Sequence, residues 1–245
     1  KLQKLIISDN LYLVKLKFHI ICMLKIPKFL NQKKIPFLFW SENKTLTVKP
    51  KLISVFFLCL GLSIFGLGEA LLIASGIGVS PWTVLAQGIT NYTNFTVGFA
   101  TFVISVLVLL CWIPLKQTPG IGTILNAIIV AFVIDFSLPY LPKPEFYFGR
   151  ILEVLIGVLI TGLGGSIYLI ANLGPGPRDG LMTGLQKITN FPIAWVRSII
   201  EISIVFLGWI LGGTVGFGTL VFAFGIGPSY SFFLFTLEKL FNKKD

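Results

Sequence analysis

A polar break in an otherwise apolar sequence carries the residues best suited to bind a solute. Residues 174–180 read Gly-Pro-Gly-Pro-Arg-Asp-Gly, and the prolines and glycines predict that one helix ends near this point and another begins at Pro177. Asp179 suits the positive end of the new helix, whereas Arg178 does not. We therefore expect a carboxylate or an anionic ligand to hold Arg178. The alternative is a cytoplasmic anchor in which Asp179 is only a helix-start residue. Gly174 and Gly176 provide the backbone freedom of the turn.

An earlier break has the same design. It contains Ser80, Pro81 and Thr83, and a short helix is predicted over residues 81–89. Ser80 suits the N-cap position and Pro81 suits the first turn. The two breaks are therefore candidate gates or binding segments.

Other polar residues fall inside apolar stretches. Arg197 and Glu201 lie four residues apart on one predicted helix, so they form either a gate with a proton-coupled carboxylate or a structural salt bridge. An unpaired Glu201 would cost about 2.5–3.5 kcal/mol in the membrane, which favours pairing. Glu69 is a candidate cation or proton site, or else a protonated group that bonds between helices. Asn126 could add an amide to the same bundle.

Asp135 and Glu153 lie near the ends of apolar stretches, where we expect water to reach them. Four tryptophans also fall near predicted span ends, as interfacial aromatics do: Trp82, Trp112, Trp195 and Trp209.

Signatures of enzymes and metal sites are missing from the sequence. The chain has one histidine, His19, and three cysteines, Cys22, Cys59 and Cys111, which do not make a ligand set or a disulfide framework. It has no Gly-x-Ser-x-Gly elbow and no phosphate-binding loop. We therefore expect no enzymatic activity, no cofactor and no metal.

Composition indicates an integral membrane protein. Hydrophobic residues make up 55% of the 245 residues and charged residues 12%, and the mean hydropathy is +0.88. The net charge of +10 is concentrated in residues 1–51, which contain eleven lysines and two acidic residues. This concentration fits a cytoplasmic flank that follows the positive-inside rule, and it argues against a nucleic-acid partner.

The fold class expected is all-α and polytopic, with six transmembrane helices and two short proline-started helices. The expected spans are 52–75, 95–113, 121–138, 151–171, 193–211 and 220–237, and the short helices are 81–89 and 177–188. The expected domains are a basic, disordered or interfacial tail (1–51), a first membrane repeat (52–140), a linker (141–147), a second repeat (148–237) and a charged tail (238–245). Because the chain begins with lysine, the tail can also reflect a misassigned start.

An internal duplication relates the two membrane segments. Shifting the chain by 96 residues superposes many glycines and prolines without a gap, including Pro81 on Pro177. Three spans per repeat is an odd number, so the second repeat should enter the membrane inverted. The first break then faces out, the second faces in, and both termini are cytoplasmic.

The long motif at 174–184 resembles the signature of the YczE/YyaS/YitT-like bacterial integral membrane proteins, closest to the YczE-like branch. Ser80-Pro81-Trp82 and the run Gly212-Gly213 support the resemblance. The resemblance implies a polytopic protein of the bacterial cytoplasmic membrane. It also implies an aspartate at the position of Thr83, and this departure weakens the case for a half-site at the first break.

The functional expectation is a small-molecule transporter or exporter that works by alternating access and carries a polar or anionic solute. The alternative is a non-transporting accessory or regulatory protein that binds a partner. The lipid bilayer is the one partner expected in either case, and the sequence leaves the substrate, the coupling ion and the oligomeric state open.

Overall fold

The structure is a computed structural model that describes residues 35–241, and this part of the chain is helical, with no β-strand. Eight α-helices follow one another, with a short 3₁₀ helix, η2 (Leu138–Tyr140), after the fourth. They are α2 (Leu52–Ser75), α3 (Pro81–Thr90), α4 (Val97–Trp112), α5 (Ile121–Ser137), α6 (Tyr147–Ala171), α7 (Pro177–Thr189), α8 (Ile193–Ile210) and α9 (Phe217–Phe241). The all-helical expectation is confirmed. The largest differences from the predicted bounds are four residues, at the start of α6 and the end of α9.

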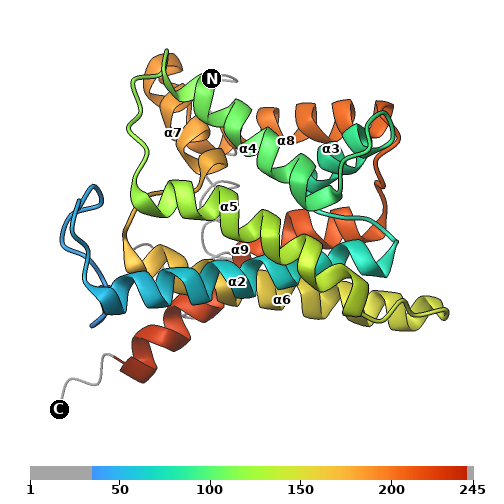
Figure 1. The fold of residues 1–245 in the computed structure, drawn as a ribbon, viewed down its shortest axis with the longest axis horizontal. Helices are drawn as coiled ribbons and strands as arrows, with labels where there is room; N and C mark the ends of the chain where they lie inside the picture. Colours follow the sequence, from blue (N-terminus) through green and yellow to red (C-terminus); the bar gives the residue numbers. More distant parts are fainter. Residues whose placement is uncertain (1–34, 242–245) are drawn as a thin grey trace, which may run out of the picture.

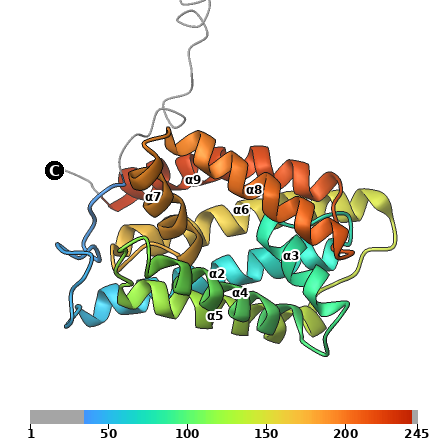
Figure 2. The same ribbon diagram turned by 90° about the horizontal axis from the view of Figure 1, so that it is seen from above.

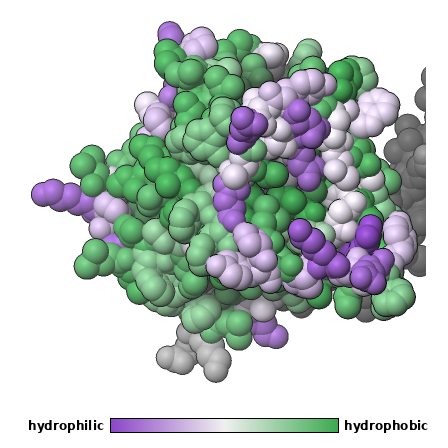
Figure 3. Space-filling view, turned by 45° about the vertical axis from the view of Figure 1, so that its right-hand side comes forward, coloured by the Kyte–Doolittle hydropathy of each residue, from purple (hydrophilic) through white to green (hydrophobic). Residues whose placement is uncertain are grey.

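Five helices are long and apolar enough to cross a membrane, namely α2, α6, α8, α9 and the continuous segment of α5 and η2. The sixth expected span, α4, is apolar but has 16 residues, fewer than the ~20 that cross a bilayer. Large apolar side chains cover the outside of the bundle, and the face in Figure 3 is dominated by them. Such a surface suits hydrocarbon rather than water.

The two 96-residue-related halves pack against each other through α2 and α6, which run antiparallel (Figures 1 and 2). A Cβ placed on Gly61 would lie 2.8 Å from the carbonyl oxygen of Gly164, and one on Gly68 would lie 2.8 Å from that of Gly157. A shift of 96 residues converts each of these two contacts into the other, because Gly61 falls on Gly157 and Gly68 falls on Gly164. Glycine is required at both because the backbones approach closely.

The loop after α2 contacts the second half, and the loop after α6 contacts the first half. The amide of Gly218 donates to the carbonyl of Ile77 at 2.9 Å, and the amide of Gly122 donates to that of Leu173 at 2.8 Å. Each loop therefore anchors the start of the last long helix of the other half. Gly78 and Gly174 adopt φ of 124° and 125°, a region that favours glycine, so the two loops share one backbone conformation.

Figure 2 shows α4 and α5 on one side of the α2–α6 pair and α8 and α9 on the other, with α3 and α7 toward opposite ends. The two sides differ in packing. On the first, Asp135 of α5 accepts from the amides of Gly98 (2.8 Å) and Phe99 (3.2 Å) and from the Thr96 hydroxyl. On the second, α8 and α9 barely touch, although both are fully described. The arrangement is therefore closed on the α4–α5 side and loose on the α8–α9 side.

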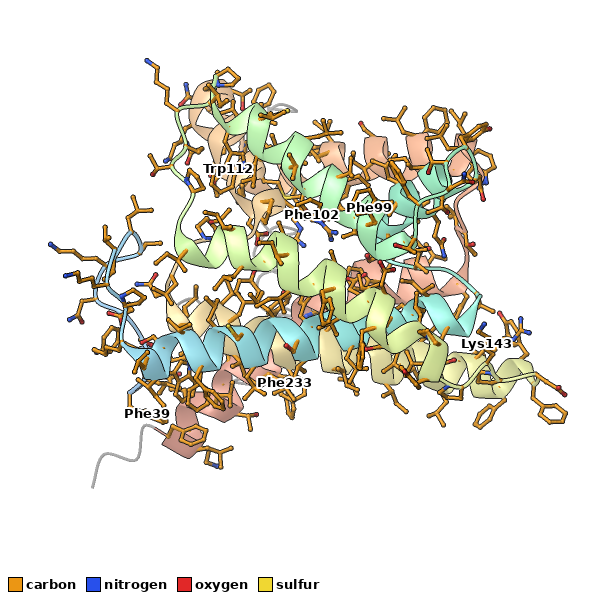
Figure 4. All side chains as sticks on the ribbon, viewed as in Figure 1. Phe39, Phe99, Phe102, Trp112, Lys143 and Phe233 are labelled. Atoms are coloured by element: carbon orange, nitrogen blue, oxygen red, sulfur yellow. The ribbon has the colours of Figure 1, made fainter. Side chains whose placement is uncertain are left out.

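The segment 35–51 packs on the bundle, so this part of the predicted tail is ordered, and its position at the membrane interface stays a prediction. The Trp40 ring is fully buried and stacks on Phe57 with 4.4 Å between ring centroids, and Phe39 lies beside it near the end of α9 (Figure 4). Ser41 donates to the Ile170 carbonyl at 2.6 Å, which ties the segment to the end of α6. Residues 1–34, with His19 and Cys22, lie outside the described residues.

Two of the four tryptophans differ from expectation. Trp195 and Trp209 are exposed, as an interfacial role requires, but Trp82 and Trp112 are buried. Trp112 lies at the end of α4 (Figure 4), and its indole N–H donates to the Pro177 carbonyl at 2.9 Å. Buried tryptophans usually pair their N–H in this way, so Trp112 positions α7 rather than marking a membrane surface.

Candidate functional site

A cavity of about 80 Å³ lies between the two halves and is lined by both polar breaks. A water molecule needs about 10–15 Å³ of such space, so the cavity has room for several waters or a compact solute. Most lining residues form pairs 96 positions apart: Ser80/Gly176, Pro81/Pro177, Trp82/Arg178, Thr101/Arg197, Ser105/Glu201, Asn126/Phe222 and Val130/Ile226. Both breaks therefore line one cavity, and the prediction that they face opposite sides of the membrane stays a prediction.

The starts of α3 and α7 both carry backbone donors without a hydrogen-bond partner, and three of the four residues concerned (Trp82, Arg178 and Asp179) line the cavity. Proline at the first helical position of each helix removes one N–H that would have no partner. The next two amides of each helix, those of Trp82, Thr83, Arg178 and Asp179, make no hydrogen bond within residues 35–241. Four free N–H groups at two positive helix ends favour negative charge between them.

Arg178 adds a positive charge beside these amides. Its guanidinium carbon lies 5.3 Å from the centroid of the Trp82 ring, a cation–π distance. In the described part of the chain no carboxylate oxygen lies within 4 Å of it, and the charges that attract it are those of Glu69 and Asp179. Of the holders expected for Arg178, a direct carboxylate partner is therefore ruled out here, and its donors remain available to a ligand.

Glu69 meets the first break from α2. Its Oε2 accepts from the hydroxyls of Ser80 at 2.6 Å and Thr83 at 2.8 Å, and all three side chains are buried. Ser80 is the N-cap residue of α3, as predicted, but its side chain does not cap the helix because it is bound to Glu69. In the sequence, Thr83 argued against a half-site at the first break. In the structure, its hydroxyl is one of the two groups that bind the Glu69 carboxylate at this break.

The second break has the opposite arrangement. Asp179 supplies the carboxylate from α7, and the Tyr168 hydroxyl of α6 donates to it at 3.2 Å. The position equivalent to Glu69 is Gly165, where an added Cβ would lie 2.1 Å from the Tyr230 hydroxyl oxygen. In one half a carboxylate of the long helix, Glu69, accepts from hydroxyls of the break. In the other half a carboxylate of the break, Asp179, accepts from a phenol of the long helix, Tyr168.

Arg197 and Glu201 form the predicted i,i+4 pair, with 2.8 Å between Nε and Oε1. Half of the Arg197 side chain and a quarter of the Glu201 side chain are exposed, so the pair borders the cavity at α8 instead of being enclosed. Arg178 does not join this pair. Asn126 lines the cavity opposite Gly176, and Gly174 remains outside it in the loop that packs on Thr123.

Four hydroxyl-bearing cavity residues were not predicted as site residues from the sequence: Thr101, Ser105, Tyr168 and Tyr230. The first two occupy the positions of Arg197 and Glu201 in the other repeat, so the 96-residue shift could have found them. The two tyrosines have no equivalent polar residue, and no sequence signal points to them.

The two acids expected near water behave differently. Asp135 caps the start of α4, as described above. Glu153 is 5% exposed, and neither carboxylate oxygen has a hydrogen-bond partner within the described residues, so its expected wetting is wrong.

Comparison with known proteins gives several relatives. A model described as "Family of unknown function (DUF6198)" matches residues 52–234. A Haemophilus influenzae protein named "Uncharacterized protein" is 44% identical over 206 residues, covering 84% of this chain and 94% of the other. In Bacillus subtilis, "Uncharacterized membrane protein YczE" is 34% identical (74% of this chain, 86% of the other) and "Uncharacterized protein YyaS" is 30% identical (76% and 94%). No solved structure matches. The resemblance to the YczE and YyaS proteins is confirmed.

Proposed function

The chain belongs to the family of unknown function DUF6198 and is an integral membrane protein, and we propose that it transports a small polar solute by alternating access. One observation carries this proposal: a single central cavity is lined by equivalent positions of both repeats. Binding at a repeat interface near the middle of the membrane, between short or broken helices, is typical of secondary transporters.

The antiparallel packing of α2 and α6 supports an inverted arrangement of the repeats. If α2 crosses the membrane in one direction, α6 crosses it in the other, and the short helices α3 and α7 enter from opposite sides. Their positive ends then meet at the cavity. Both termini lie on the cytoplasmic side of the bacterial inner membrane, where the lysine-rich first 51 residues satisfy the positive-inside rule.

The chemistry of the cavity favours a solute that carries a carboxylate or phosphate group. The Arg178 side chain and the free amides of the lining residues Trp82, Arg178 and Asp179 are donors to an anion. Asp179 and Glu201 could receive a donor elsewhere on the same molecule. The small cavity volume suits a compact metabolite rather than a drug-sized ligand, which needs about 300–1,000 Å³. We propose no enzymatic role, cofactor or metal.

The α4–α5 side and the α8–α9 side differ in packing, and we propose that they act as the two gates. The α4–α5 side is closed by Asp135, whereas its equivalent is Ser231 and the equivalents of Thr96 and Gly98 are Pro192 and Ala194. The loose side includes α9, in which Pro228 interrupts the backbone hydrogen bonding of the helix. In the proposed cycle, α8 and α9 approach while the Asp135 contact opens.

A reconstitution experiment tests the proposal. Purified protein in vesicles is supplied with radiolabelled amino acids, small carboxylates and inorganic phosphate, and uptake is compared for wild type, Arg178→Ala and Arg150→Ala. Arg150 is the matched control because it lies outside the cavity and its Nε donates to the Pro144 carbonyl. We expect flux of at least one solute, its loss in Arg178→Ala and its retention in Arg150→Ala. If no solute moves and a protein partner is recovered reproducibly, the accessory role replaces transport.

A further inference from the structure

The buried cluster of Glu69, Ser80 and Thr83 contains three oxygens in mutual hydrogen-bond contact. The Ser80 Oγ lies 2.6 Å from Glu69 Oε2, the Thr83 Oγ1 lies 2.8 Å from the same atom, and the two hydroxyl oxygens are 2.9 Å apart. Each side chain is at most 1% exposed. All three distances are ordinary for O–H···O bonds.

Counting hydrogens shows what the cluster lacks. Each hydroxyl has one hydrogen, so an ionised Glu69 leaves the cluster with two hydrogens for three contacts. If both hydroxyls donate to Glu69, their own contact holds no hydrogen. A proton on Oε2 supplies the third: the carboxyl donates to one hydroxyl, that hydroxyl donates to the other, and the second donates back to Oε2. Every contact of the ring is then a hydrogen bond.

The second carboxyl oxygen points to the same state. Oε1 of Glu69 is buried and has no hydrogen-bond partner within residues 35–241. An ionised carboxylate would leave part of its charge on this unpaired atom, and burying unpaired charge is far more costly than burying a neutral carbonyl. Arg178 does not form a direct ion pair with it, since the described part of the chain contains no such contact within 4 Å.

We infer that Glu69 is a proton-binding site and that its proton is coupled to the binding of an anionic solute beside Arg178. This inference rests on the proposed transport function and names its coupling ion. The step is the addition of one proton to the carboxylate, with no other bond made or broken. Among the described residues, Arg178 of α7 and Tyr230 of α9 are ionisable groups that interact electrostatically with Glu69, and the α3 side presents the Ser80 and Thr83 hydroxyls to it.

The coupling follows from charge. Arg178 is attracted by Glu69 and by Asp179, and protonation of Glu69 removes the first of these attractions. The guanidinium is then left with less compensating negative charge, so an anionic solute binds more strongly. A solute that binds in this way enters or leaves together with one proton.

Infrared difference spectroscopy on the reconstituted full chain tests proton binding without any solute. The carboxyl C=O stretching band is followed while the pH is raised, in wild type, Glu69→Gln and Glu153→Gln. Glu153 is the matched control because it is a second buried glutamate whose carboxylate has no hydrogen-bond partner among residues 35–241. We expect a band that shifts in heavy water, titrates away at high pH, disappears in Glu69→Gln and remains in Glu153→Gln.

A conservative variant covers the case in which Glu69→Gln does not fold. Thr83→Val keeps the shape of the side chain and the carboxyl group but removes one member of the ring, so the band should shift in frequency while remaining present. Superimposable spectra of wild type, Glu69→Gln and Thr83→Val across the pH range would overturn the inference. So would a wild-type band that sodium chloride removes at constant pH, since the site would then bind a cation. A titrating Glu69 band in a protein without any solute flux would retain the proton site and reject transport.

Discussion

Arg178 and Trp82 occupy equivalent positions in the two repeats, and the Arg178 guanidinium carbon lies 5.3 Å from the centre of the Trp82 ring. Two residues related by the 96-residue shift, a cation and an aromatic ring, therefore meet at the central cavity. The ring holds the guanidinium without using its N–H donors, so these stay available to a ligand.

Replacing Trp82 by leucine should weaken solute binding because Arg178 loses its aromatic support. A cation–π contact contributes about 0.5–2 kcal/mol, so we expect the half-saturation concentration of flux to rise by about 2- to 30-fold. Trp209→Leu is the control, since this tryptophan is exposed on α8. Equal half-saturation in both variants would mean that the ring does not position Arg178.

The inverted arrangement predicts opposite sidedness for equivalent loops. Tyr92 and Ile188 lie 96 residues apart, and both side chains are well exposed. In a chain whose cysteines, Cys22, Cys59 and Cys111, are replaced by serine, Tyr92→Cys should react with a membrane-impermeant thiol reagent only from outside, and Ile188→Cys only from inside. Labelling of both from one side of the vesicle contradicts the inverted repeat. Tyr92, in the loop after α3, and Ile188, in the last turn of α7, suit this measurement better than Ser80 and Gly176, which are buried at the same cavity.

Much of the fold could be predicted from sequence because proline and glycine mark the helix ends. Pro81 and Pro177 begin α3 and α7 as expected, and Gly76 and Asn172 end α2 and α6 in left-handed conformation. These signals are local. They place elements along the chain but do not say which elements meet in space.

The errors concern contacts between segments far apart in the sequence. Trp112 looked interfacial because it ends an apolar helix, but α7 packs over it and Pro177 accepts its N–H. Glu153 looked wetted because it is close to a helix start, yet α6 is enclosed there by its neighbours. Thr83 suggested that the first break lacks a carboxylate, but its hydroxyl donates to the carboxylate of Glu69, fourteen residues earlier.

Loss of the Asp135 charge should loosen the closed side of the protein. The Asp135→Asn side chain keeps the size of the original but accepts more weakly from the amides of Gly98 and Phe99, at a cost of about 1–2 kcal/mol. We expect a cysteine at Thr101, in the cavity lining, to become reactive from the side of the 91–96 loop. Glu145→Gln, in an exposed loop, is the control and should leave the reactivity unchanged. Unchanged reactivity in Asp135→Asn would exclude Asp135 as a gate.

The close α2–α6 contact predicts a sharp difference between two glycines. A Cβ on Gly68 would lie 2.3 Å from the Thr161 hydroxyl oxygen and 2.5 Å from the Thr161 amide nitrogen, so the helices must separate in Gly68→Ala. Overpacking of this kind costs about 1–3 kcal/mol or more. Gly227→Ala in α9 is the control because its Cβ would meet nothing within 4 Å. Thermal unfolding in detergent should show a lower melting temperature for the first variant alone, and equal melting would mean that the helices do not approach this closely.

Glu42 gives the stability of the protein a dependence on pH. Its Oε1 accepts from the Lys51 amide at 2.6 Å and from the Ser54 hydroxyl at 3.0 Å, at the start of α2. The Lys51 amide is the main reason that the pKa of Glu42 lies below its ordinary value of 4.5. Because the folded pKa is the lower one, the stabilisation is fully present above about pH 4.5 and is lost as the pH falls through the folded pKa. Glu42→Gln removes this charge, so we expect a lower melting temperature at pH 7 and a smaller loss between pH 5 and pH 3, roughly the range in which carboxylates titrate. Glu145→Gln should retain the wild-type pH profile, and an identical profile in Glu42→Gln would show that the bond from Lys51 does not stabilise the fold.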